Sequence, residues 1–175
     1  MIEWLKKRMY RPCPYTYRVD IPKNMEWSFA RYYIDLARIE IDHDIGNFLH
    51  GQGLLWEVVT VKNTKSWLCR NTIRVKEPEW FKKQGKENSI AFCRYNLLGG
   101  RDIYIKTRLI LGNDKEIINV IAHEMGHAVG LDHTDDAKCN MYPYQHSDNT
   151  GRILEFKFYK WYRFPWLLLN LFRRL

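Results

Sequence analysis

Three histidines and one glutamate lie close together in residues 123–133, which read HEMGHAVGLDH. His123 and His127 are four residues apart, so on a helix they lie on one face, one turn from each other, and can present ring nitrogens to a single metal ion. Glu124 directly follows the first histidine and is placed to take a proton from a water molecule. This spacing predicts a helical zinc site with hydrolytic chemistry.

A third histidine can complete the ligand set of such a site. A catalytic zinc ion takes three protein ligands and keeps one position open for water or substrate. Gly130 tolerates the left-handed turn that ends a helix, and His133 follows three residues later. The helix, its break and the third histidine together favour a catalytic zinc site over surface histidines on an ordinary amphipathic helix.

The histidines are expected on a helix with defined ends. The run KEIINVIAHEMGHAV (115–129) predicts a helix with one apolar stripe, formed by Ile117, Ile118, Ile121, Ala122, Met125 and Val129. Asn113 and Asp114 are typical of a helix start, and Gly130 is typical of the residue after a helix end. The first two histidines would therefore lie beside the stripe that faces the core.

The upstream segments predict the rest of the fold. β-rich runs indicate strands at 15–22, 54–61, 67–75, 89–95 and 101–111. Apolar residues at helical spacing predict a helix from Trp27 to Ile41, and a loop that contains His43, Asp44 and His50 is expected to follow, up to Gly53. This order predicts an α+β fold with one mixed, twisted sheet of about five strands and two long helices, the histidine helix lying under the sheet.

The length of 175 residues predicts one domain. We divide the chain into an N-terminal extension at 1–14, a catalytic domain at 15–152 and an aromatic, basic C-terminal segment at 153–175. The apolar run 164–169 is far shorter than the roughly 20 residues that a membrane span requires. The C-terminal segment is expected to pack on the domain, with contact at a membrane interface as the alternative.

The charge and the cysteines bound the functional class. The net charge is +8, but the basic residues are spread along the chain, which favours a basic surface over a specific nucleic-acid site. No CxxC pair occurs and no signal-peptide core is visible. We therefore expect a cytoplasmic location, with free thiols at Cys13, Cys69, Cys93 and Cys139. We also expect the protein to be a monomer.

The motif HEMGHAVGLDH, together with the later run MYP (141–143), resembles the signature of the metzincin zinc peptidases, and MYP resembles the turn of their matrixin branch. The resemblance implies that Glu124 is the general base and acid. It also implies one catalytic Zn²⁺ ion with three ligands, which are His123, His127 and His133.

The resemblance extends to the surroundings of the metal. It implies that Met141 forms a hydrophobic floor under the ion and that Pro143 and Tyr144 shape the wall of the substrate pocket. By order, the strand near Asp102–Lys106 resembles the edge strand on which these enzymes bind an extended peptide. Cys139-Asn140-Met141 is similar to the Cys-x-Met run of archaemetzincins, but no later CxxC follows, so no second structural metal is expected.

These observations predict a zinc-dependent endopeptidase that hydrolyses protein or peptide substrates bound in extended form. One alternative is a zinc-binding module without catalysis, which the intact Glu124 disfavours because a structural site needs no base. The other is a basic protein that binds nucleic acid or a membrane surface, for which the charge and the aromatic C-terminal segment are the only support.

Overall fold

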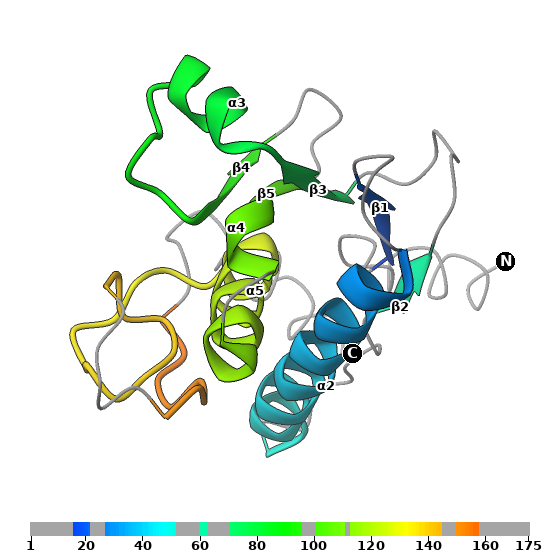
Figure 1. Ribbon diagram of the computed structural model, residues 1–175. Helices are drawn as coiled ribbons and strands as arrows, with labels where there is room; N and C mark the ends of the chain where they lie inside the picture. The colour runs from blue at the N-terminus through cyan, green and yellow to red at the C-terminus, as the bar shows by residue number, and fades with distance from the viewer. Residues whose placement is uncertain are drawn as a thin grey trace, which may run out of the picture.

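The computed structural model describes residues 16–21, 27–51, 60–62, 71–95, 101–110, 113–144 and 150–157, and Figure 1 shows their arrangement. In chain order, the elements are β1 (Thr16–Asp20), α2 (Trp27–Gly51), β2 (Thr60–Lys62), β3 (Asn71–Lys76), α3 (Pro78–Lys83), β4 (Ala91–Tyr95), β5 (Arg101–Lys106), α4 (Thr107–Ile110) and α5 (Asp114–Ala128). The predicted α+β class, with a mixed sheet and two long helices, is confirmed.

The five strands form one sheet in the order β2-β1-β3-β5-β4. The first four are parallel to their neighbours, and β4 pairs antiparallel with β5. The edge position expected for Asp102–Lys106 is therefore wrong, because β5 lies between β3 and β4, and β4 forms the edge. Consistent with an interior strand covered on both faces, five consecutive residues of β5 are buried, from Arg101 to Ile105.

Helix α2 is longer than the sequence pattern predicted. Its buried stripe continues from Ile41 to Ile45, and Phe48 packs partly buried against the same core. This continued helical spacing outweighs the low helix propensity of Gly46, so the loop expected before Gly53 is wrong. His43, Asp44 and His50 are helical residues, and Asp44 is buried.

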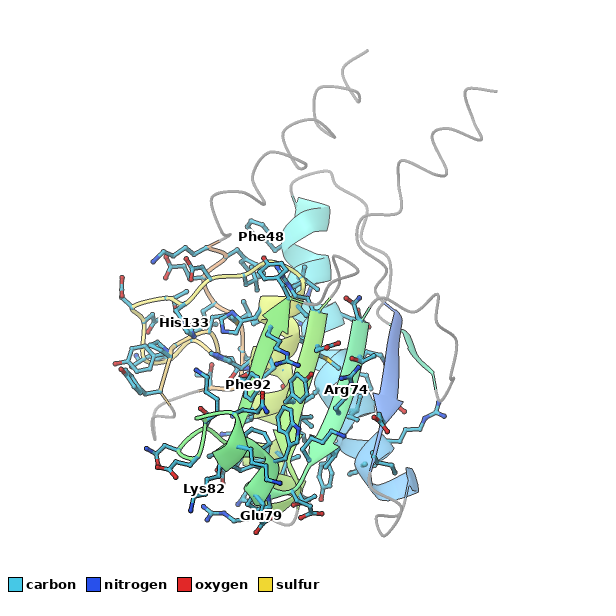
Figure 2. All side chains as sticks on the ribbon, turned by 90° about the horizontal axis from the view of Figure 1, so that it is seen from above. Phe48, Arg74, Glu79, Lys82, Phe92 and His133 are labelled. Carbon is cyan, nitrogen blue, oxygen red and sulfur yellow. The ribbon has the colours of Figure 1, made fainter. Side chains whose placement is uncertain are left out.

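Helices α2 and α5 pack against each other under one face of the sheet, as Figure 2 shows from the opposite face. Ile73 and Ile103 of the sheet belong to one buried cluster with Ile34 of α2 and Ile121 of α5. Helix α5 begins as expected, with the Asn113 side chain accepting the Lys115 N–H at 2.9 Å. The fold thus fixes α5, with its histidines, beside α2 and against β4 and β5.

The outer face of the sheet carries α3, which the sequence pattern did not predict. Pro78 lies in its first turn, two residues after β3 ends at Lys76. Phe81 is fully buried, and Trp80 stacks on Tyr104 with ring centroids 4.6 Å apart. The end of the predicted fifth strand is instead the short helix α4.

The first part of the predicted C-terminal segment packs on the domain. Ile153 is buried in the core, and the Phe156 ring stacks on Phe48 at 4.0 Å. The rest of that segment (158–175), the predicted extension at 1–14 and the two cysteines Cys13 and Cys69 lie outside the described residues. Cys93 and Cys139 are free thiols. Within the ranges given above, no helix is long and apolar enough to cross a bilayer.

Candidate active site

The three histidines of the motif converge at the end of α5. Their ligand atoms all lie within 4.8 Å of one another, with His123 and His127 on the helix and His133 in the segment that follows it. The positive φ of Gly130, 100°, turns the chain back toward the helix. The Nε2 atoms of His127 and His133 are 3.1 Å apart. Two nitrogen ligands of a tetrahedral zinc ion are separated by about 3.3 Å, so the pair has the spacing of a zinc site.

Backbone carbonyl groups orient two of the rings. His123 Nδ1 lies 2.6 Å from the carbonyl oxygen of Asn140, and His127 Nδ1 lies 2.8 Å from that of Leu131. When Nδ1 carries the proton and donates it, the Nε2 lone pair is available to a metal. These residues therefore fit a zinc ion in ligand type, number and tautomer.

The protonation states of the histidines agree with a metal site. Burial lowers the pKa of His123 to about 4 and that of His127 to about 3, and it also lowers the pKa of His133. Each imidazole is consequently neutral at pH 7, and the neutral form is the one that binds zinc.

Met141 lies against Gly126 of α5. It is fully buried, and a Cβ atom added to Gly126 would lie 2.5 Å from its Sδ atom. Only a glycine at this position allows so close an approach. Met141, the predicted floor residue, therefore packs on the helix that carries His123 and His127. Gly126 is a further residue of this region that sequence reasoning missed, although it lies inside the motif.

Glu124 is buried on the side of α5 that faces the edge strand. Glu124 is only 7% exposed, and its carboxylate accepts a hydrogen bond from the backbone N–H of Cys93 in β4. Among the described residues, the Oε2 atom has no hydrogen-bond partner. Burial raises the pKa of Glu124 to about 8, against the lowering effect of the Cys93 bond. A positive ion at the histidines would lower this pKa and favour the carboxylate.

A cleft lined by the histidines runs along β4. Figure 2 shows His133 beside this edge of the sheet. A cavity of about 350 Å³ is lined by all of β4, Arg101, Pro143 and the four motif side chains, namely His123, Glu124, His127 and His133. A second cavity of about 730 Å³ shares Ala91, His123, Glu124 and Pro143 with the first, and Tyr144 lines only the second. Of the predicted pocket residues, Pro143 thus lines both cavities and Tyr144 lines the second.

Two further residues of the site were not indicated by the sequence. Arg101 lines the first cavity although it is only 2% exposed, and its guanidinium lies over the Tyr95 ring. Cys93 contributes the backbone group that holds Glu124. Both positions are defined by strand pairing, and no motif in the sequence marks them.

Comparison with known proteins places this geometry in a family. The family model described as matrixin, a peptidase family, matches residues 24–155. A solved archaemetzincin from Methanopyrus kandleri is similar in fold, with a TM-score of 0.52, 13% identity, and coverage of 90% of this chain and 95% of that chain. A search of curated protein sequences found no match. On the family match over most of its length, the chain belongs to the matrixin family of zinc metallopeptidases.

Proposed function

We propose that this protein is a zinc-dependent endopeptidase that cleaves polypeptides bound in extended form along β4. One observation carries the proposal: three convergent histidines lie next to a buried carboxylate in a cleft that follows the edge of the sheet. A site that served only for structure would need neither the carboxylate nor the cleft.

Glu124 is the proposed general base and acid. Zinc, when bound by the histidines, supplies Lewis acidity that lowers the pKa of water and polarises a carbonyl group. The Glu124 side chain lines the same cavity as the histidines, and its Oε2 atom has no hydrogen-bond partner among the described residues. It is placed to take the proton of the attacking water and to deliver it to the leaving amine.

The proposed docking strand is β4, in place of the segment 102–106. The Lys106 N–H donates to the Ile90 carbonyl at 2.9 Å, so these two residues form a hydrogen-bonded pair. Pairs alternate along an antiparallel ladder, so Phe92 and Arg94 direct their backbone groups toward β5. Ala91, Cys93 and Tyr95 then direct theirs toward the edge, where an extended peptide can add as a further strand.

The contact between Cys93 and Glu124 agrees with this register. The Cys93 N–H must point away from β5 to reach a carboxylate on α5. Peptide backbone groups would pair with Ala91 and Tyr95 on either side of it. In this proposed arrangement, the peptide bond opposite Cys93 would lie next to both Glu124 and the histidines.

Metal removal and restoration test the proposal. Protein treated with a chelator should lose hydrolysis of a peptide library and should regain it with one equivalent of zinc. The cleaved products should be internal fragments, as expected for an endopeptidase. Zinc binding without hydrolysis of any library member would support the non-catalytic zinc module instead.

A further inference from the structure

We propose that Asp44 of α2 is a positioning residue for the metal site, because it holds segment 150–153, which in turn holds Asn140, the residue whose carbonyl group orients His123. The inference rests on the proposed zinc site and assigns a role to a residue that lies in a different helix from the ligands. It is argued from a chain of hydrogen bonds that leads from α2 to the ring of His123.

The first link is a buried carboxylate with converging donors. The Asp44 side chain is only 3% exposed. Its Oδ2 atom accepts the backbone N–H of Ile153 at 2.7 Å, and its Oδ1 atom accepts from Arg152, with Nε at 2.7 Å. A carboxylate is costly to bury unless such donors satisfy it, so its position on α2 determines where the segment 150–153 can lie.

The second link joins that segment to the turn that contains Met141. The Arg152 carbonyl accepts the backbone N–H of Asn140 at 2.8 Å, and the Lys138 carbonyl accepts the Thr150 N–H at 3.0 Å. Residues 138–140 and 150–152 are therefore held side by side. Any shift of Arg152 is transmitted directly to the backbone of Asn140.

The third link joins Asn140 to the metal site. Asn140 is 2% exposed, and its carbonyl oxygen is the atom that lies 2.6 Å from His123 Nδ1. Its side-chain amide donates to the Asn119 carbonyl at 3.0 Å, one turn before His123 on α5. Asn140 thus has its backbone N–H, its side chain and its carbonyl all engaged, and the carbonyl can point in only one direction.

Gly151 shows how closely the segment must approach α5. Its φ is +78°, and a Cβ atom at this position would lie 2.4 Å from Asn119 Oδ1. Segment 150–153, which Asp44 holds, therefore packs directly against α5, the helix that carries His123. Displacement at Asp44 should therefore move the Asn140 carbonyl rather than be absorbed on the way.

The expected consequence is weaker metal binding without loss of the fold. Groups that accept the outer N–H of a metal-bound histidine contribute about 10- to 100-fold to metal affinity. Asp44 acts through one such group, so we expect Asp44→Asn to weaken zinc binding by about tenfold. The exchange of the His123 Nδ1 proton with solvent should become faster.

The test measures zinc affinity by chelator competition, and His123 Nδ1–H exchange by NMR, under conditions in which circular dichroism shows a folded protein. Asp35→Asn is the matched control, because Asp35 lies on the same helix in an exposed ion pair with Arg31. We expect zinc affinity to decrease in Asp44→Asn and to stay unchanged in Asp35→Asn. Wild-type affinity and exchange in Asp44→Asn would overturn the proposal and leave Asp44 as a residue of fold stability alone.

A second variant covers the case in which Asp44→Asn does not fold. Arg152 is half exposed, and Arg152→Ala removes the guanidinium while leaving the bond from Ile153 to Asp44. Arg152→Ala should also weaken zinc binding, but by less than the loss expected for Asp44→Asn. Wild-type zinc affinity in Arg152→Ala would overturn the proposal. Neither readout depends on hydrolysis. A wild-type protein that binds zinc but cleaves nothing would contradict the proposed activity and leave this comparison valid.

Discussion

Replacing Gly126 by alanine should destabilise the protein, although glycine-to-alanine changes inside helices usually stabilise. The added Cβ atom would lie 2.5 Å from Met141 Sδ and 3.2 Å from Met141 Cε. Carbon contacts are optimal near 3.5–4.0 Å, so the sulfur must move by about 1 Å. Met141 is fully buried, so the flexible end of its side chain can make room only by repacking against its buried neighbours.

The magnitude follows from two opposing effects. Overpacking a buried site costs about 1–3 kcal/mol. The gain in helix propensity offsets about 0.5–1 kcal/mol of this. We therefore expect Gly126→Ala to lower the free energy of unfolding by about 1 kcal/mol. Urea unfolding followed by circular dichroism, with a chelator present, measures this change without a contribution from bound zinc.

The sign of the effect decides the interpretation. In a Met141→Ala background, the obstructing side chain is absent, and Gly126→Ala should become stabilising by about 0.5–1 kcal/mol. Such a reversal would show that the two residues are in contact. If Gly126→Ala stabilises the wild-type protein by the same amount, Met141 does not pack against Gly126, and our description of this contact is refuted.

Two further predictions concern pH and the edge strand. Below pH 6.5, the unfolded chain binds protons on His123 and His127 that the folded chain does not bind. The stability that these histidines contribute to the metal-free protein is therefore present above pH 6.5 and is lost as pH falls through about 4 for His123 and about 3 for His127. Glu124 acts in the opposite sense, because its pKa is raised to about 8 in the folded protein. The stability that it contributes is therefore lost as pH rises from 4.5 through 8. The urea midpoint of the metal-free protein should decline between pH 6.5 and 8 in the wild type but not in Glu124→Gln. At the edge of the sheet, Ala91→Pro removes a backbone N–H that the register directs toward substrate, so kcat/KM should fall while β4 stays paired with β5. Ala91→Gly, which keeps the N–H, is its control, and equal kcat/KM in both variants would argue against docking along β4.

Local patterns in the sequence were sufficient to predict the helix that carries the site. The start of α5 at Asn113, its end before Gly130 and the spacing of the histidines all depend on residues within one or two turns. Such short-range features are encoded directly in side-chain type and helical periodicity. This is why the helix could be predicted with its boundaries.

Features that depend on tertiary pairing could not be predicted in the same way. The order of strands along the chain did not reveal that β5 inserts between β3 and β4, so the docking strand was misplaced. The residues after Ile41, which we expected to form a loop, are helical because Ile45 and Phe48 pack against apolar residues of the core. The bond from Asp44 to Arg152 joins residues 108 positions apart, and no local pattern indicates it.

The central claim is that Glu124 is the base of a zinc peptidase, and the direct measurement compares wild type with Glu124→Gln. Zinc content and hydrolysis of a quenched peptide library should be determined on the same samples. We predict one zinc ion per chain in both proteins and a loss of hydrolysis of about 100-fold or more in the variant. Hydrolysis at the wild-type rate by zinc-loaded Glu124→Gln would contradict the claim.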